Sequence, residues 1–335
     1  MERFVGRVLA VIALAVVALA VWQLSDLLLL MFGGILLSLA LRAGAEVLAR
    51  ITPLRPAWAV PVVLVLTLAA LAGAGWLAGA RVGAQFAELS HKIPAAAAQL
   101  QHWAQEQPLG QALMQLFGGP NAAPPIGVLA RLGGVATSVL GGVAEVVLVL
   151  MVTIYLAVDP DTYRDGVVAL VPPRLRLRAR AVLADLAQTL RAWLVGQAIA
   201  MASIGVLTTV GLLVLGIPLA LSLGVIAGLL EFIPFVGPVL SAVPAILVAF
   251  AQSPMDAVWT ALLYLAIQQV EGHVAMPLIQ ARAVALPPAL TVVATVGMGM
   301  LFGFTGMLFA TPLVAAGMVL VRMVYVEGLL ERDGG

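Results

Sequence analysis

The sequence predicts an all-α fold of the polytopic membrane class. Two features of the composition predict this class: 63% of the 335 residues are hydrophobic, and only 10% are charged. An ordinary soluble domain has roughly 25% charged residues, because its exterior must face water. The apolar runs are continuous, as in residues 8–21 and 143–158, whereas the strands of a membrane barrel alternate apolar and polar side chains. We therefore expect helices as the spanning elements.

Each candidate span is an apolar run close to the ~20 residues that a helix needs to cross a bilayer. The nearly unbroken apolar region 219–326 has room for three to five crossings. Residues 1–20 also resemble a signal peptide, but the second apolar run follows so closely that a helical hairpin is the better interpretation. The candidate spans before residue 219 are 8–24, 27–41, 58–80, 135–158 and 193–215.

Proline and glycine interrupt the last apolar region. Such breaks are tolerated at membrane depth only where protein or a water-filled cavity satisfies the backbone. Residues 218–312 are therefore the predicted place of an internal pathway, with broken or re-entrant segments. The interrupting residues are Pro218, Pro234, Gly237, Pro238, Pro244, Pro254, Pro277, Pro287, Pro288 and Pro312.

Two polar stretches divide the apolar pattern. Residues 81–131 mix glutamines with leucines and alanines and end in a Gly-Gly-Pro turn, which predicts an amphipathic helical hairpin. Residues 159–191 hold six arginines. The predicted divisions are transmembrane helices at 1–80, an amphipathic extracytoplasmic insert at 81–134, a fourth span at 135–158, an arginine-rich cytoplasmic segment at 159–192, a transport core at 193–326 and a tail at 327–335.

The arginines also predict the orientation of the chain. Short loops rich in arginine stay cytoplasmic. If the N-terminus is cytoplasmic, this rule places successive loops on alternate sides of the membrane through the first four spans. We therefore expect a multi-pass protein of the bacterial inner membrane, with the lipid bilayer as its first partner.

Several function classes are excluded or disfavoured. The net charge is +1, so no overall field points to nucleic acid. The chain has no cysteine and a single lysine, Lys92, which lies outside any glycine-rich nucleotide-binding loop. No His-Glu-x-x-His or Gly-x-Ser-x-Gly motif is present. We expect no enzyme activity, no cofactor and no metal site.

Glu231 is the first candidate site residue, because a charge within apolar sequence normally faces a cavity or a partner. It opens the run Glu231-Phe-Ile-Pro234-Phe-Val-Gly237-Pro238. A helix that ends there leaves free carbonyl groups beside a carboxylate, and the next helix begins with free N–H groups. Such a break suits a cation or a polar solute.

A second cluster comprises Gln268, Gln269, Glu271 and His273. On a helix, Gln268 and Glu271 share a face because three residues separate them, and His273 lies on another face. Glutamates held in apolar surroundings could also couple transport to protons.

Structural interpretations of these residues remain open. Glu231 and Glu271 could form a packing network near prolines, and Glu145 could bridge two helices. A lone His273 is better explained by packing than by metal binding. Asp256 is the predicted N-cap of a helix. The glycine pairs Gly224/Gly228 and Gly299/Gly303 suit helix-packing notches or oligomer contacts.

The second half of the chain carries an ordered series of short motifs. In this order, over about residues 190–325, they resemble the AI-2E transporter family, also called the autoinducer-2 exporter or PerM-like permease family. The layout of the first half agrees. The motifs are Arg191-Ala-Trp-Leu-Val-Gly-Gln197, Gly216-Ile-Pro218, Glu231-Phe-Ile-Pro-Phe-Val-Gly-Pro238, Gln268-Gln-Val-Glu-Gly272, Met276-Pro277, Gly303-Phe-Thr-Gly306 and Ala310-Thr-Pro312.

The resemblance implies an inner-membrane transporter of about eight transmembrane helices that assembles as a homo-oligomer, plausibly a pentamer. Family members are linked to export of the small polar signal autoinducer-2, and others to exchange of sodium or lithium for protons. The sequence departs from the family pattern at His273 and at Gln280-Ala281-Arg282, so substrate and coupling ion stay open.

The first hypothesis is a secondary exporter of a small polar solute. The alternatives are a monovalent cation/proton antiporter and a membrane scaffold whose hairpin at 81–131 binds a partner.

Overall fold

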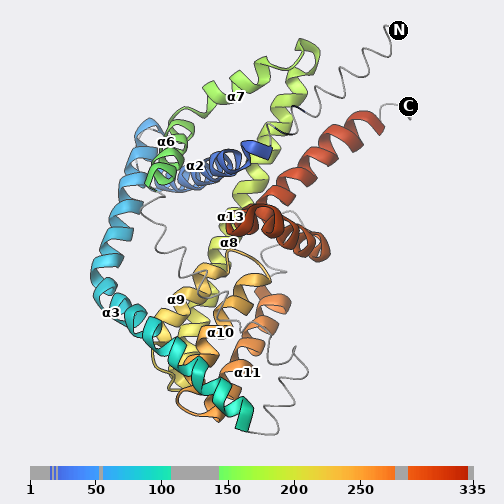
Figure 1. The fold of residues 1–335 in the computed structure, drawn as a ribbon. Coiled ribbons are helices and arrows are strands. Elements are labelled where there is room, and N and C mark those ends of the chain that lie inside the picture. Colours follow the sequence, from blue (N-terminus) through green and yellow to red (C-terminus); the bar gives the residue numbers. More distant parts are fainter. Residues whose placement is uncertain are drawn as a thin grey trace. The chain divides into compact units, whose positions relative to one another are not determined.

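The computed structural model describes residues 22–52, 56–106, 143–275 and 286–330, together with Val16 and Leu19. Every regular element in these residues is a helix (Figure 1), and this confirms the all-α class. The predicted span at 8–24 and the turn of the predicted hairpin at 81–131 lie largely outside the described residues.

The chain divides into two compact units. The first comprises residues 1–47, 144–191 and 286–335, and the second comprises residues 48–143 and 192–285. Each unit is therefore assembled from segments that are distant in sequence.

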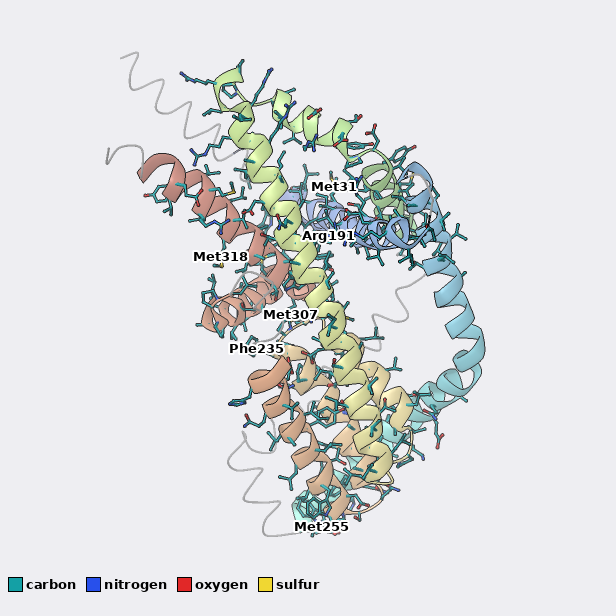
Figure 2. All side chains as sticks on the ribbon, turned by 180° about the vertical axis from the view of Figure 1, so that it is seen from behind. Met31, Arg191, Phe235, Met255, Met307 and Met318 are labelled. Atoms are coloured by element: carbon teal, nitrogen blue, oxygen red, sulfur yellow. The ribbon has the colours of Figure 1, made fainter. Side chains whose placement is uncertain are left out.

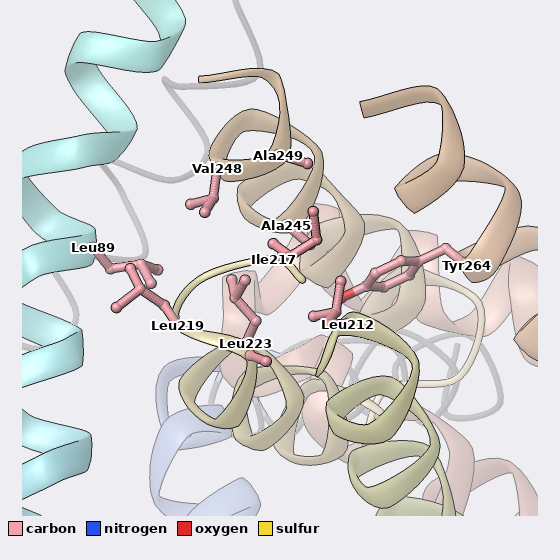
Figure 3. Packing of buried hydrophobic residues seen from close by; sticks show 10 residues of the cluster. Leu89, Leu212, Ile217, Leu219, Leu223, Ala245, Val248, Ala249 and Tyr264 are labelled. Atoms are coloured by element: carbon pink, nitrogen blue, oxygen red, sulfur yellow. The ribbon is translucent and has the colours of Figure 1, made fainter. Parts of the chain in front are cut away.

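The core of the second unit lies among three short helices. These are α9 (Ala220–Leu230), α10 (Val236–Phe250) and α11 (Pro254–Val270), and α10 packs against both of the others. The long helix α3 (Pro56–Glu106) covers α9 and α10. The buried side chains of one cluster between these helices are apolar, apart from the hydroxyl of Tyr264 (Figure 3). They include Leu89, Leu212, Ile217, Leu219, Leu223, Ala245, Val248 and Tyr264.

Helices α9, α10 and α11 are 11, 15 and 17 residues long, which is shorter than the ~20 residues of a full span. Since α9 and α10 are neighbours in sequence and also pack against each other, the chain turns back at the break between them. The prediction of broken or re-entrant segments is therefore confirmed. Proline at 234 and a left-handed residue at Phe235, with φ of 66°, explain why one continuous helix does not form here.

Glycines allow α8 (Arg176–Val214) to approach α9 closely. A Cβ added to Gly205 would lie 3.3 Å from the carbonyl oxygen of Gly224 and 3.5 Å from the Cα of Gly228. Small residues permit such backbone contact between membrane helices. The predicted notch at Gly224/Gly228 is therefore a helix-packing site.

The first unit is built around α2 (Ser25–Ile51). Gly34 lies against α6 (Val143–Val158), where its carbonyl oxygen accepts a hydrogen bond of 3.3 Å from the Thr153 hydroxyl. Phe32 meets Phe309 of α13 (Pro288–Leu320) edge to face, with ring centroids 5.9 Å apart. These contacts hold α6 and α13 to the same central helix.

In α13, a glycine interrupts the helix instead of allowing close helix packing. Gly303 adopts φ 62° and ψ −144°, which are not helical angles, and it kinks α13. Gly299 then faces the side chain of Met307 in the same helix. Because a notch needs a continuous helix face, Gly299 and Gly303 form no such notch, and an oligomer contact at this pair stays a prediction.

Two sharp changes of direction shape the rest of the first unit. The axis bends by 90° between α6 and α7 (Pro160–Ala169). Asp159 is the N-cap there: its side chain accepts hydrogen bonds from the backbone N–H and the hydroxyl of Thr162. The 3₁₀ turn η2 (Pro173–Leu175) then leads into α8, and the π-helix η4 (Val321–Leu330) follows α13.

Three helical segments of the described residues are long and apolar enough to cross a membrane: Ser25–Ile51, Pro173–Val214 and Pro288–Glu327. The bent pair of α6 and α7 adds a fourth if it counts as one span. These segments agree with the predicted spans at 27–41, 135–158 and 193–215. The expected total of eight stays a prediction.

Two helices run further than the polarity pattern suggested. α3 continues through residue 80 to Glu106, so the third span and the first arm of the predicted hairpin are one helix. α8 begins at Arg176, well before the predicted start at residue 193. Arginine and glutamine are good helix formers, so a change of polarity does not end a helix.

The start of α11 corrects one prediction. The Ser253 hydroxyl accepts a hydrogen bond of 3.1 Å from the backbone N–H of Asp256, so Ser253 is the N-cap. The prediction of Asp256 as the N-cap is wrong. Pro254 occupies the first helical position, where its fixed φ suits the helix, and this places the cap one residue before it.

Candidate functional site

Glu231 lies at the C-terminal end of α9 and is buried. Its side chain is only 2% exposed, and its Oε2 atom has no hydrogen-bond partner among the described residues. Burying an unpaired carboxyl oxygen costs free energy, and such groups are rare enough in proteins to need an explanation. We therefore regard Glu231 as the centre of the candidate site.

The structure brings Glu271 to Glu231 across forty residues of sequence. The side chains of the two glutamates are close enough to interact electrostatically. Glu271 is half-buried at the end of α11, and its Oε2 accepts a hydrogen bond of 2.9 Å from the Gln268 side chain. The prediction that Gln268 and Glu271 share a face is confirmed.

Gln197 is a site residue that the sequence interpretation missed. Its side-chain amide in α8 donates a hydrogen bond of 2.7 Å to the backbone carbonyl of Glu231. One turn earlier, the ring of Trp193 meets Phe232 edge to face, with centroids 5.6 Å apart. α8 therefore contacts the break in two places, at the backbone carbonyl of Glu231 and at the ring of Phe232. An amide within an apolar span was the signal that could have identified Gln197.

The break itself has unusual backbone geometry. Pro234 is buried, and the bulky Phe235 that follows is exposed and has positive φ (Figure 2). The N–H of Gly237 donates to the Ile233 carbonyl at 2.8 Å. A Cβ at Gly237 would overlap the Leu230 carbonyl oxygen, so only glycine fits there. Pro238 is buried in the first turn of α10.

Two of the predicted residues lie outside this cluster. The side chain of Gln269 is exposed, and only its backbone carbonyl is bound, by His273 Nδ1 at 2.9 Å. His273 is also exposed, in the π-helix η3 (Glu271–Ala275). Single π-helical turns often occur at functional sites, but neither side chain is joined to Glu231.

The remaining sequence predictions concern Glu145, metal binding and the motif residues after 275. Glu145 is exposed at the start of α6 and has no hydrogen bond or ion pair within the described part of the chain, so the bridging role has no support. Within the same part, no group of three or more His, Cys, Asp or Glu side chains is placed to hold a metal ion. The motif residues Met276 and Pro277, and the departure at 280–282, lie outside the described residues.

The chemistry available at the site follows from these contacts. Two neighbouring carboxyl groups repel each other when both are ionised, and a proton or a monovalent cation between them removes that repulsion. The same oxygens accept hydrogen bonds from hydroxyl groups. Several backbone groups at the break are already hydrogen-bonded, among them the carbonyls of Leu230, Glu231 and Ile233, so the side-chain oxygens of the two glutamates are the groups that face a ligand. The site can therefore bind a small polar solute or a cation.

Comparison with known proteins shows the family of the chain. The family model described as "AI-2E family transporter" matches residues 11–325. The matched region includes both units and every residue of the candidate site.

Several bacterial proteins are similar over part of their length. The chain is 30% identical to the "Putative transport protein YueF" of Bacillus subtilis over 183 residues, which are 53% of this chain and 50% of that protein. It is 30% identical to the "Putative transport protein YrrI" of the same organism over 171 residues, 51% of this chain and 48% of that protein. A Mycobacterium tuberculosis protein, also named a "Putative transport protein", is 36% identical over 148 residues, 44% of this chain and 39% of that protein. The chain thus spans about half the length of these relatives, or less.

Proposed function

Because the chain belongs to the AI-2E transporter family, we propose that it is a secondary membrane transporter that moves a small polar solute past the Glu231–Glu271 pair. The observation that carries the proposal is the unpaired Oε2 of Glu231, buried at a helix break and beside a second carboxyl group. Transporters commonly bind their substrates at interrupted helices, where backbone and side-chain groups meet the solute.

In this proposal Gln268 and Gln197 position the two carboxyl groups. Gln268 donates to Glu271 and orients it, and Gln197 fixes the end of α9. The free oxygen of Glu231 would then accept a hydrogen bond from a hydroxyl group of the solute. Pro234, Gly237 and Pro238 set the geometry of the break, which the solute would pass. Gln269 and His273 would act, if at all, at the exposed entrance of the path.

The proposed cargo is a small polar organic molecule of the autoinducer-2 type, moved outward. A polyhydroxylated furanone offers several hydroxyl donors, and carboxylate and amide oxygens are suitable acceptors for them. The proposal also includes the orientation with a cytoplasmic N-terminus in the inner membrane, which follows from the arginine-rich segments, and assembly as a homo-oligomer.

Efflux from proteoliposomes tests the function. We would load vesicles containing the pure protein with radiolabelled autoinducer-2 furanone and a panel of small polyols, and follow their release. Glu231→Gln and Glu271→Gln should each abolish efflux, because the amide has a different charge and donates where the carboxylate accepts. Glu145→Gln is the matched control, since Glu145 is an exposed carboxylate within the predicted span at 135–158.

The outcomes separate the candidate functions. Wild-type efflux in both site variants would remove these glutamates from the mechanism. If no solute moves, but sodium or lithium collapses a proton gradient reported by a pH-sensitive dye, the carboxyl pair serves cation/proton exchange instead. Efflux that is lost equally in Glu145→Gln would point to a general effect of charge removal.

A further inference from the structure

An apolar groove of about 480 Å³ lies in the first unit, whereas the candidate transport site belongs to the second. The end of α7, the turn η2 and the first turns of α8 form one side of it, and α13 and η4 contribute to the other. Arg178 is the one charged residue among its described lining. The apolar lining residues include Val171, Leu175, Val182, Leu186, Leu320 and Val324.

Three arginines beside this groove have no carboxylate partner in the described part of the chain. Arg178 donates to the backbone carbonyl of Met323. Arg176 donates to the carbonyls of Val171 and Ala169, at 3.2 and 3.4 Å. Arg174 is exposed and has no described hydrogen bond or ion pair. A bond to a neutral carbonyl leaves the positive charge uncompensated, so all three guanidinium groups keep a net charge for an external anion.

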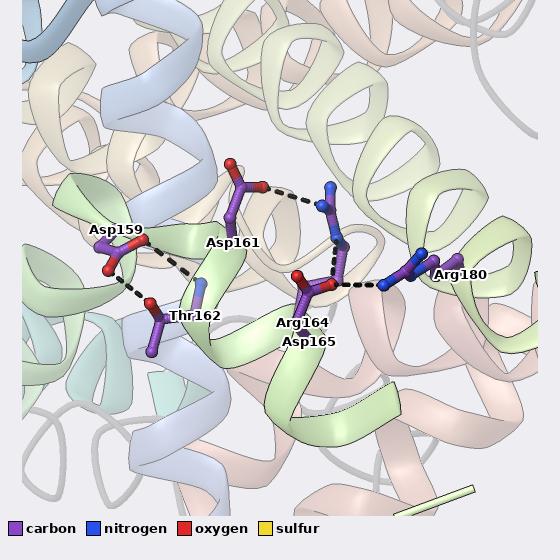
Figure 4. Close-up of polar contacts among 6 residues, drawn as sticks. All are labelled: Asp159, Asp161, Thr162, Arg164, Asp165 and Arg180. Carbon is purple, nitrogen blue, oxygen red and sulfur yellow. Dashed lines mark hydrogen bonds and ion pairs between the residues drawn. The ribbon is translucent and has the colours of Figure 1, made fainter. Parts of the chain in front are cut away.

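The neighbouring arginines are different, because each already has an acidic partner. Arg164 pairs with Asp161 at 3.1 Å and lies 3.7 Å from Asp165, and Arg180 reaches Asp165 at 3.4 Å (Figure 4). Arg191 pairs with Glu46 at 2.7 Å, and Arg322 with Asp185 at 2.5 Å. Within residues 159–191, the uncompensated charge is therefore confined to the run from Arg174 to Arg178.

Apolar side chains next to the same arginines are unusually exposed. Leu170 is 86% exposed and Leu177 is 84% exposed. They lie in the connection between α7 and α8 and in the first turn of α8, on either side of Arg174. Leucines and arginines presented together are typical of a segment that lies in the boundary between lipid headgroups and acyl chains, where arginines bind phosphate.

We propose that this groove binds an anionic phospholipid. One acyl chain would occupy the apolar groove, and the phosphodiester would be bound by Arg174, Arg176 and Arg178. The two parts of the ligand correspond to the two parts of the site: the lining is otherwise apolar, and the positive charge comes from Arg178 in the lining and from Arg174 and Arg176, which flank the lining residue Leu175 in the sequence. A zwitterionic lipid would fill the groove equally well, but it would leave the three arginines without a net counter-charge.

The lipid would link two parts of the first unit. Arg178 comes from α8 and bonds to a carbonyl of η4, and the lining residues Leu320 and Val324 come from α13 and η4. A bound lipid would therefore contact the same helices that this bond joins. We expect occupancy to stabilise the contact between α8 and the C-terminal helices.

Lipid titration of the full chain in a mild detergent tests the proposal. Phosphatidylglycerol and phosphatidylcholine with identical acyl chains would be added, and bound lipid would be counted by native mass spectrometry while thermal unfolding is followed. Glycerol 3-phosphate would report binding of the headgroup chemistry alone. The test variants are Arg174→Gln with Arg176→Gln, and separately Ala179→Phe, which fills the groove. The matched control is Arg164→Gln with Arg180→Gln, which removes the same charge from paired arginines.

We expect phosphatidylglycerol, and not phosphatidylcholine, to bind and to raise the unfolding temperature. Each unpaired arginine removed should weaken its apparent affinity about fivefold at low salt, and higher salt should weaken binding further. Ala179→Phe should lower lipid retention with the arginines intact. Arg174→Gln alone removes no described hydrogen bond, so it tests the charge even if the double variant unfolds.

Four results would overturn the proposal. Equal binding of phosphatidylcholine would show that the charge is not used. Equal loss in the Arg164/Arg180 control would show only a general effect of charge. Full stabilisation by glycerol 3-phosphate, without any effect of Ala179→Phe, would indicate a simple phosphate site. A change in oligomeric state on Ala179→Phe with unaltered lipid binding would assign the groove to a second copy of the chain.

Discussion

Gln197 and Glu231 are joined by a hydrogen bond of 2.7 Å, in which the side-chain amide of one helix binds the last backbone carbonyl of another. This carbonyl would otherwise be left without a partner at the end of α9. The bond holds Glu231 through its backbone carbonyl, so the carboxyl oxygen Oε2 of Glu231 stays unpaired. Gln197 is therefore a positioning residue in the proposed site.

Gln197→Leu should reduce solute efflux strongly while the protein still folds. A neutral hydrogen bond contributes about 1 kcal/mol to stability, so the unfolding temperature should fall only slightly, but the end of α9 would lose its fixed position. Gln188→Leu is the control, since Gln188 is exposed in the same helix. If efflux by Gln197→Leu equals that of the wild type, Gln197 has no positioning role.

Gly237→Ala should destabilise the protein by about 1–3 kcal/mol, the usual cost of overpacking. The added methyl group would overlap the Leu230 carbonyl oxygen, which is backbone and cannot rotate away. Thermal unfolding in detergent, followed by tryptophan fluorescence, measures the change. Gly297→Ala should be neutral or slightly stabilising, because nothing lies within 4 Å of its added Cβ. Equal stability of both variants would contradict the geometry of the break.

Gln85→Ala should cost about 1–3 kcal/mol, because it leaves buried donors unpaired. The Gln85 side-chain oxygen in α3 accepts from both the hydroxyl and the backbone N–H of Ser222, at 2.9 and 3.3 Å. Ser222 is fully buried in the first turn of α9. Gln99→Ala, at an exposed position of α3, should have little effect on the same unfolding measurement. A cost for Gln99→Ala as large as that for Gln85→Ala would show that the hydrogen bonds to Ser222 are not the cause, since alanine favours the helix more than glutamine does.

Gly303→Ala should destabilise the first unit by about 1–3 kcal/mol, because its φ of 62° and ψ of −144° lie close to a region that only glycine enters freely. Gly317→Ala, in the regular part of α13 with nothing within 4 Å of the added Cβ, should be tolerated. Comparing the unfolding temperatures of the two variants checks the kink. A stabilising Gly303→Ala would mean that α13 is straight at this position.

The membrane class and the two glutamates could be predicted because both follow from one rule. Apolar helices are stable in lipid, and a charged group is stable among them only beside a partner. The rule identified Glu231 and Glu271 separately. The meeting of the two carboxyl groups depends on how α9 and α11 pack, and the spacing of residues along the chain does not contain that information.

Three features were harder to predict, for a different reason: the role of Gln197, the N-cap of α11 and the helix boundaries. Each depends on which of several polar residues has the correct position relative to a helix end. Ser253 takes the cap because Pro254 follows it, and Asp256 lies three residues too far into the helix. Likewise, α3 and α8 continue through polar sequence, because glutamine and arginine favour the helix as strongly as leucine does.

Helix α3 is too long for the membrane alone. Its 51 residues would extend about 77 Å at 1.5 Å per residue, whereas the hydrocarbon layer is only about 30 Å thick. Its charged pairs, such as Lys92 with Glu88 at 2.7 Å, lie in its second half, so we expect that half to stand in water. Ala96 and Ala97 of this half pack on Leu247 near the end of α10. The C-terminal end of α10 therefore packs on the part of α3 that we expect to lie outside the hydrocarbon layer.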